Sequence, residues 1–556
     1  MKIPENLSDR HSLYRNKIRQ IDMASRTSRR SKWRRMRSWL LLGNDSGVQV
    51  RHNAIEKLVN ISTAHLFAPE RVRFGVILPP HYGDQWIEEE DGARLELQRL
   101  WNDTDTGLVA LSAVRWAHAM DTLTAKVIVD RNVPTLTILA DPSDIGVLEE
   151  DGDDLDKQEA ICHFYTMSLP KYERMVRTHP DVKYREELIR EAREHATPME
   201  GSGGADFLPP TVQRLILAQA SPNMIGQVNY ASDTSLAMPQ VREPVVPLAE
   251  LWIWDDDQQD YRVVKNFLPT ERILWDPINP LVPGEHPFHP LCYGPVPGYG
   301  WGVPAIESVL PLQALLTERL EQISYIMQMN YRPPYVGIGF TGILEEKMEA
   351  LREPGGFLPI PPGPGNTDIK PVVPQMPPDA FAEVQEIERM MAAQFGLPPI
   401  LHGQTEPGVR SGEQAAVLAT LSSGPTFSRA MRVEDWVESI TTQMLRLQRR
   451  VMSQTLRKVN GDEWWLSQMP NDFVVRVSAH SSSPVYSEQI VQKVALAKSW
   501  GAIDNEDAIR LLNLPHDELL VAKARKLAEA AAKRAERVLE VKEREAKAKE
   551  VKAMRG

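Results

Sequence analysis

Two histidines and two acidic clusters are the residues whose types and spacing come nearest to a metal site. His286 and His289, in the string HPFHP, could ligate a metal ion, but the neighbouring prolines favour a rigid loop and no Cys or Asp completes a ligand set. The acidic clusters at 88–91 and 149–154 offer carboxylate oxygens, which divalent cations prefer. We interpret both clusters as solvated surface loops, and we expect no metal.

The sequence lacks the short motifs of common enzyme classes. It contains no GxxxxGK[ST] phosphate loop, no HExxH and no GxSxG. Gly298, Gly300 and Gly302 mimic a dinucleotide-binding loop, but Pro295 and Pro297 surround them and no strand leads directly into a GxGxxG pattern. We therefore expect a non-enzymatic protein without a cofactor.

Composition indicates a globular chain with several domains. The 556 residues are 42% hydrophobic and 25% charged. Cys162 and Cys292 are far apart, which favours neither a disulfide framework nor a zinc site and fits a reducing compartment such as a bacterial cytoplasm. No apolar run is long enough to span a membrane, and the first residues lack the apolar core of a signal peptide. We expect no membrane insertion.

Two amphipathic segments in the middle of the chain, 304–331 and 379–396, predict a helical hairpin. Pro304 suits a first-turn position, Asp379 is an N-cap residue, and Gly396 ends the second helix. Apolar residues step by three or four in each segment, which places them on one helical face. In the first segment they are Val309, Leu312, Leu316, Leu320, Ile323 and Met327, and in the second Phe381, Val384, Ile387, Met390 and Met391.

The insert between these helices, 332–378, is crowded with proline. Proline fixes φ and lacks a backbone donor, so a regular helix cannot persist there, and only 342–352 is predicted as a short helix. A glycine-rich loop at 402–411 follows the second helix. Helix, insert, returning helix and loop are the layout of an oligomer built around a channel.

Several strings in this region resemble tailed-bacteriophage portal proteins, the head-to-tail connectors. They are GYGWGVPAIESVLPLQ, RPPY, GGFLPIPPG, AAQFGLPPILHG and GVRSGEQAAVLA, in that order. The resemblance covers roughly residues 53–515. It implies an α+β, mainly helical portal fold with a basic N-terminal arm (1–45), a wing (46–303), stem helices (304–331 and 379–396), a clip (332–378), a tunnel loop (397–412), a long kinked helix with a wing return (413–483) and a helical crown (484–556).

The resemblance also implies roles for individual residues. The clip would present 342–352 to the terminase large subunit and later to a head-tail adaptor, through Leu344, Glu345, Lys347 and Arg352. The flexible tunnel loop would follow the DNA with Gln404, Thr405, Glu406, Val409 and Arg410, although an ordinary surface connection is the alternative.

Paired carboxylates occur at i, i+3 spacing in both stem helices. They are Glu318 with Glu321 and Glu383 with Glu386. Catalytic acids would need a pocket that a narrow hairpin does not offer. We interpret these residues as lining the channel or bridging to Arg319 and Arg389 of adjacent copies.

The formal net charge of −11 disfavours a protein that grips DNA by neutralising phosphates. In a ring of about twelve copies, the usual number in the family, the charge would be roughly −130. Weak or repulsive contacts suit a channel through which duplex slides, although mild acidity is also common in soluble proteins.

The N-terminal arm carries a positive net charge, whereas the net charge of the whole chain is negative. Its basic residues surround Trp33 and are Arg29, Arg30, Lys32, Arg34, Arg35 and Arg37. Such a cluster is typical of nucleic-acid or acidic-partner contacts. Packing on an acidic neighbouring subunit or scaffold and direct contact with DNA both stay open.

The wing is predicted as mixed α+β. Helices are expected after Asn53, at 108–121 and at 172–197, and strands at 126–130, 135–139, 160–167, 249–254 and 261–267. Towards the C-terminus we expect a helical stretch at 412–456 broken at Gly424-Pro425, a strand at 473–478, two helices at 487–499 and 505–512, and a last helix at 517–554. That last helix would either bundle with its copies into a short barrel or stand alone.

Our hypothesis from sequence is a portal subunit of the virion, assembled in the host bacterial cytoplasm as a ring at one capsid vertex. Its partners would be double-stranded DNA in the channel, the terminase large subunit, a head-tail adaptor, the major capsid protein and scaffold. A monomeric nucleic-acid- or scaffold-binding protein is the second hypothesis. A hydrolase that uses metal at the acidic clusters is the third.

Overall fold

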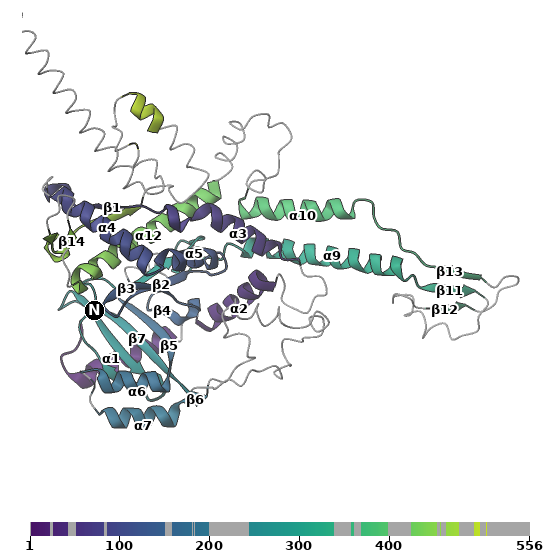
Figure 1. Cartoon of the computed structure of the whole chain (residues 1–556). Coiled ribbons are helices and arrows are strands. Elements are labelled where there is room, and N and C mark those ends of the chain that lie inside the picture. The colour runs from purple at the N-terminus through teal and green to yellow at the C-terminus, as the bar shows by residue number, and fades with distance from the viewer. Residues whose placement is uncertain are drawn as a thin grey trace, which may run out of the picture.

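The computed structural model consists of a broad body from which a two-helix arm projects (Figure 1). It describes residues 2–22, 26–42, 52–82, 86–150, 158–180, 182, 184–198, 244–338, 357–360, 368–397, 424–452, 456–457, 463–477, 494–500 and 508. The body is α+β and includes the described residues of 46–303, the two N-terminal helices and the long helix that begins at Gly424. No helix within these ranges is long and apolar enough to cross a membrane.

A six-stranded antiparallel sheet forms one part of the body. Its order is β4 (Ile145–Val147), β5 (Ala160–Ser168), β7 (Pro244–Asp255), β8 (Asp260–Phe267) and β9 (Arg272–Trp275), with β6 (Thr197–Pro198) paired to β7. Helices cover both faces. Val246 and Leu248 of β7 pack with α6 (Leu169–Thr178) and α7 (Arg185–His195).

The other side of β7 faces the N-terminal helix α1 (Leu7–Asp22). Leu251 and Ile253 pack there with Tyr14 and Ile18. Because alternate residues of a strand point to opposite faces, a strand covered on both sides needs apolar residues in succession. Residues 245–254 of β7 are accordingly apolar except for Glu250, and only 249–254 had been predicted as a strand.

The main core lies around a second sheet. Three antiparallel strands, in the order β10 (Phe288–Leu291), β2 (Leu123–Asp130) and β3 (Val133–Ile138), pack against helices on one side of the body. The helices are α2 (Arg26–Leu42), α3 (Ala54–Leu66), α4 (Ile87–Asp103), α5 (Thr106–Trp116) and α12 (Gly424–Val451). The long helix α12 lies across this sheet with Val433, Trp436, Val437, Ile440 and Met444 buried.

Short strand pairs complete the body. β16 (Val474–Val477) pairs with β1 (Phe74–Ile77), which confirms the strand predicted at 473–478. β14 (Leu456–Arg457) pairs with β15 (Glu463–Trp464). The predicted break at Gly424-Pro425 coincides with the first residues of α12, and the chain before it lies outside the described residues.

Three sequence predictions in the body were wrong. The helix predicted at 172–197 is two helices, α6 and α7, since Pro180 disfavours a helical conformation at His179. The acidic run at 88–91 is the first part of α4 rather than a loop, at a helix end that favours negative charge. HPFHP is not a loop either, because residues 288–291 form β10 and pair with β2.

Candidate functional site: a two-helix arm and its anchors

The arm consists of α9 (Leu310–Tyr331), α10 (Ala380–Phe395) and a small sheet between them in the sequence. The first helix was predicted to begin at Pro304, but a 3-10 turn (Glu307–Val309) precedes α9 and Pro311 occupies its first turn. The second helix is where it was expected, with Asp379 at the N-cap position and Gly396 in the left-handed conformation at φ 84° after the last turn. The predicted hairpin is therefore confirmed.

The seam between the two helices is narrower than predicted. Leu316 and Ile323 of α9 are buried, and so are Ile387 and Met391 of α10. Other members of the predicted apolar faces lie at the surface of the single chain. Met327, Phe381 and Met390 expose 44%, 57% and 42% of their area.

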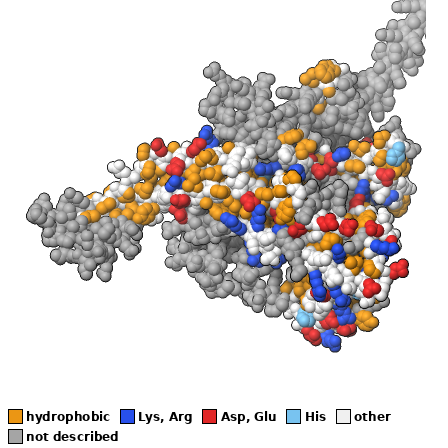
Figure 2. All heavy atoms as spheres, turned by 180° about the vertical axis from the view of Figure 1, so that it is seen from behind, with side chains coloured by type: hydrophobic (Ala, Val, Ile, Leu, Met, Phe, Trp, Pro, Cys, Tyr) orange, Lys and Arg blue, Asp and Glu red, His pale blue; other side chains and the backbone are white. Residues whose placement is uncertain are grey.

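Large apolar side chains are exposed on opposite sides of the arm. Phe381 and Met390 are nine positions apart, which at 3.6 residues per turn places them about half a turn from each other on α10. Tyr325 and Met327 are likewise on opposite sides of α9. Tyr331, at the far end of α9, is 85% exposed. Figure 2 shows hydrophobic side chains along the length of the arm.

Arginine and carboxylate side chains of the stem helices pair within the single chain. Arg319 of α9 donates to Glu383 of α10 at 2.8 Å. Arg389 donates to Glu386 one turn before it, also at 2.8 Å. In addition, Gln322 donates to Glu318 at 3.0 Å. Glu321 is half-buried on α9.

The end of the arm carries a small sheet that was not predicted. β11 (Tyr335–Ile338) is central, parallel to β12 (Phe357–Ile360) and antiparallel to β13 (Asp368–Pro371). Pro359 and Pro371 lie in the two outer strands, where a missing backbone donor is tolerated. The predicted contact residues Leu344, Glu345, Lys347 and Arg352 lie outside the described residues. So do the predicted tunnel-loop residues Gln404, Thr405, Glu406, Val409 and Arg410 and most of the predicted crown.

Gln313 anchors α9 to the body. Its fully buried side chain donates to the His52 carbonyl oxygen at 2.8 Å and accepts from the backbone N–H of Ala54 at 3.1 Å. His52 also contacts Glu388 of α10 at 2.7 Å. The chain at the start of α3 thus holds both arm helices. A buried polar residue within an apolar stripe was the signal that the sequence offered for this anchor.

Replacing Gln313 by leucine should lower the free energy of unfolding by about 1–3 kcal/mol, since the N–H of Ala54 and the carbonyl of His52 would lose their buried partner. Urea denaturation of the variant and of Gln322→Leu, at an exposed position of the same helix, provides the comparison. Equal losses in both variants would argue against Gln313 as an anchor.

The C-terminal end of α10 is held by α12 and α5. Thr426 donates to the Gly396 carbonyl oxygen at 3.1 Å, and Arg429 donates to that of Phe395 at 3.0 Å. The Phe395 ring stacks on His118, with 5.6 Å between ring centroids. Ser62 hydrogen-bonds His118 at 3.0 Å, and burial lowers the pKa of His118 to about 3.

The two histidines of HPFHP contribute to the core instead of a metal site. His289 hydrogen-bonds Ser439 of α12 through Nδ1 and Gln443 through Nε2, both at 2.8 Å. Both ring nitrogens are therefore occupied, and burial lowers the pKa of His289 to about 4. Nowhere in the described part of the chain do three or more His, Cys, Asp or Glu side chains cluster as metal ligands would.

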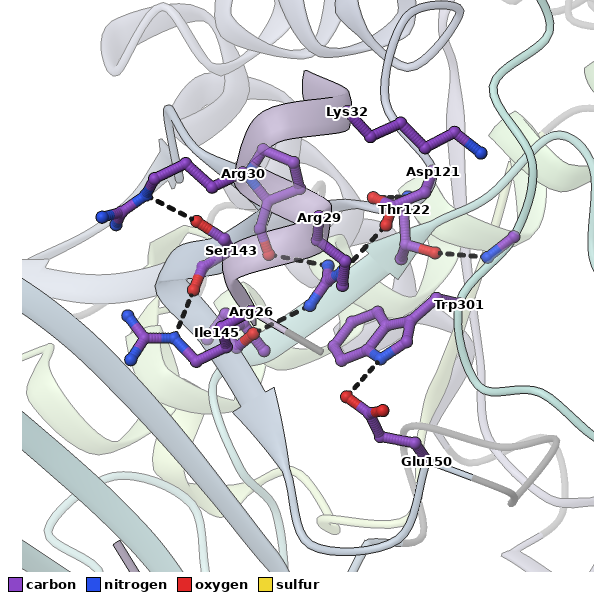
Figure 3. A network of polar contacts seen from close by, with 12 residues as sticks. Arg26, Arg29, Arg30, Lys32, Asp121, Thr122, Ser143, Ile145, Glu150 and Trp301 are labelled. Atoms are coloured by element: carbon purple, nitrogen blue, oxygen red, sulfur yellow. Dashed lines mark hydrogen bonds and ion pairs between the residues drawn. The ribbon is translucent and has the colours of Figure 1, made fainter. Parts of the chain in front are cut away.

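The basic helix α2 contacts acidic residues of its own chain, which neither sequence interpretation anticipated (Figure 3). Arg29 is only 4% exposed and donates to Asp121 at 2.8 Å and to the carbonyl oxygens of Pro142 and Ile145 at 2.7 and 3.0 Å. Its guanidinium lies 3.3 Å from the ring centroid of Trp301. We name these residues the Arg29 cluster.

Neighbouring basic residues of α2 differ in their exposure. Arg30 pairs with Asp141 at 3.3 Å, and Lys32 pairs with Glu307, just before α9, at 2.8 Å. Arg34 and Arg35 are exposed, and Arg37 is half-buried.

Trp301 and Gly302 connect the Arg29 cluster to the segment that leads into the arm. Trp301 donates to Glu150 at 3.0 Å, and the backbone N–H of Gly302 donates to Thr122 at 3.2 Å. A side chain at position 302 would meet the Cys292 sulfur and two backbone oxygens. Close packing therefore accounts for this glycine, in agreement with the rejection of a dinucleotide loop.

Comparison with known proteins finds no matching protein family and no matching curated protein. Among solved structures, a chain of the "Virion of native gene transfer agent (GTA) particle" is 12% identical with a TM-score of 0.36, over 86% of this chain and 92% of that chain. A chain of the "Neck of empty GTA particle computed with C6 symmetry" is 11% identical with a TM-score of 0.35, over 84% and 90% of the two chains. At this level of similarity, function has to be argued from the residues of this chain.

Proposed function

We propose that this protein is a portal subunit, a non-enzymatic structural protein of a phage-like virion that assembles as a ring around a DNA channel. The observation that supports this most directly is the arm, whose exposed apolar side chains lie on opposite sides. Each copy in a ring meets two neighbours through two different faces. A single arm therefore has the surface distribution that ring closure requires.

The energy available from this surface is substantial. Burial of a phenylalanine or methionine side chain contributes about 1.5–3 kcal/mol, and Phe381, Met390, Tyr325, Met327 and Tyr331 are all partly or largely exposed in one copy. Because Arg319 and Glu383 already pair within the chain, the polar groups of the arm do not need a neighbour. Association would thus be driven mainly by apolar contact.

In this proposal the ring carries double-stranded DNA through its centre. The net charge of −11 per chain gives a wall that repels phosphates, so the duplex can slide. The end of the arm would bind the terminase large subunit and later a head-tail adaptor. The body would meet the major capsid protein and scaffold.

The monomeric nucleic-acid-binding alternative has less support. It used the basic N-terminal arm together with the C-terminal helix, which lies outside the described residues. In the basic arm, Arg29, Arg30 and Lys32 each pair with a carboxylate of the same chain, whereas Arg34 and Arg35 are exposed. A cation held in this way cannot also neutralise a phosphate without breaking its pair.

The direct test is the mass of the purified full chain in native buffer together with end-on negative-stain images. We expect rings of about twelve copies with a central hole. Monomers or dimers over a range of salt, at high protein concentration, would exclude the portal proposal. Filter binding of duplex DNA to the same monomers would then support the alternative.

A double substitution on the arm should prevent assembly without unfolding the chain. Phe381→Ser with Met390→Ser removes one exposed apolar side chain from each side of α10, so every interface in the ring would lose on the order of 3 kcal/mol or more. We expect monomers by analytical ultracentrifugation, with an unchanged circular dichroism spectrum. Tyr184→Ser, which alters a 71% exposed tyrosine on the body, is the matched control and should leave rings intact.

A further inference from the structure

An exposed proline-rich stretch joins the small sheet of the arm to α10. Residues 371–378 read PVVPQMPP, and none of them is buried. Val372 and Val373 are 42% and 53% exposed. Pro374 and Met376 are half-buried, and the other six residues of the stretch are exposed.

The stretch is preorganised as an extended polyproline-type segment. Proline fixes its own φ and restricts the preceding residue to extended conformations, which together covers most of this stretch. Pro371, Pro374 and Pro377 recur every third residue, the repeat of a polyproline II helix, so they form one ridge. Its start is fixed by the N–H of Val372, which donates to the Pro334 carbonyl oxygen at 2.8 Å.

A ridge of this kind binds aromatic side chains, because the spaces between proline rings accept a flat ring at small entropic cost. Tyr331 is the most exposed large apolar side chain in the described part of the chain, at 85%. It lies only three residues before Pro334, so it stands at the same level of the arm as the start of the ridge. At 85% exposure it makes little contact with the ridge of its own chain.

We propose that the proline ridge at 371–378 of one copy docks against Tyr331 of the adjacent copy. This inference rests on the proposed ring. It names the contact that joins adjacent copies of that ring at the far end of the arm. The two halves of the contact belong to different helices of the arm (Figure 1). The proline ridge leads into α10, whereas Tyr331 is the last residue of α9. A second copy, rather than an unrelated protein, fits because one chain supplies both halves of the contact.

Cysteine cross-linking between two differently tagged chains tests the contact. A Tyr331→Cys chain is coassembled in turn with Val372→Cys, Val373→Cys or Gln375→Cys chains, which sample different edges of the ridge. Disulfide-linked pairs of unlike chains are expected on non-reducing gels after mild oxidation. The control replaces the Tyr331→Cys chain by a Tyr184→Cys chain, which should give no disulfide-linked pairs. The native Cys162 is buried and Cys292 is half-buried, which limits their background.

The outcomes separate this inference from the portal proposal. Rings visible in end-on images that give no linked pair with any of the three ridge positions would overturn the docking contact and leave the ring standing. Failure of the unmodified chain to form rings would overturn the portal proposal itself. A second measurement uses Tyr331→Ser and Tyr331→Phe, where we expect the serine variant alone to need about tenfold more protein to form rings. Equal behaviour of the two variants would also count against the contact.

Discussion

Replacing Arg29 by alanine should lower the free energy of unfolding by about 3–5 kcal/mol, because Asp121 would remain buried without its partner. Two backbone carbonyls would lose a charged donor in the same step, and the Trp301 ring would lose the cation that covers it. Urea denaturation followed by tryptophan fluorescence measures this loss directly, since Trp301 and Trp33 lie at α2 and its contacts.

Arg34→Ala is the control for this experiment. It removes the same charge from the same helix at an exposed position, where a change within about 0.5 kcal/mol is expected. Arg29→Lys should recover little, since an ammonium group cannot reproduce the planar fork that reaches Asp121 and two carbonyls. Similar losses for Arg29→Ala and Arg34→Ala would mean that the Arg29 cluster contributes no special stability.

Acidification should destabilise the fold strongly because three histidines are held neutral. Burial lowers the pKa of His118 and His163 to about 3 and that of His289 to about 4, from the ordinary 6.5. Their stabilising contribution is complete above pH 6.5, where the unfolded chain is also neutral, and is lost as pH falls towards the folded pKa. Each histidine lowers the free energy of unfolding by up to about 1.4 kcal/mol per pH unit. Together the three lower it by up to about 8 kcal/mol between pH 6.5 and 4.5.

The contribution of one histidine to this loss of stability at low pH can be measured by substitution. His289→Gln keeps polar groups facing Ser439 and Gln443 but cannot be protonated, so its urea midpoint should fall less between pH 7 and pH 5 than that of the unmodified chain. His81→Gln, at an exposed position, should leave the pH dependence unchanged. A pH profile identical in all three proteins would contradict the assignment.

Helices and strands of this fold were predictable where apolar residues recur at regular spacing in the sequence. The α9–α10 hairpin follows from apolar residues at helical spacing, and the prediction of a strand at 249–254 covers the second half of β7. The small sheet of the arm was missed because the prolines of the insert were used only to exclude a helix, whereas the outer strands of a sheet tolerate Pro359 and Pro371.

Contacts between distant residues could not be predicted from local pattern. Arg29 resembled its neighbours in a basic run, and nothing near it in the sequence points to Asp121 or Trp301 as partners. Within the single chain Met327 lies at the surface, and Arg319 pairs with Glu383 of the returning helix, a partner that local spacing does not indicate.

The Arg29 cluster also constrains how the chain is made. Trp301 follows Arg29 by roughly 270 residues, so at a typical elongation rate of about 5–20 residues per second the helix leaves the ribosome well before its aromatic cover exists. Asp121 and the carbonyl groups of Pro142 and Ile145 are synthesised earlier, so the guanidinium can be paired before its aromatic cover exists. The environment of α2 is therefore completed only when the segment leading into α9 is made, just before the arm itself is synthesised.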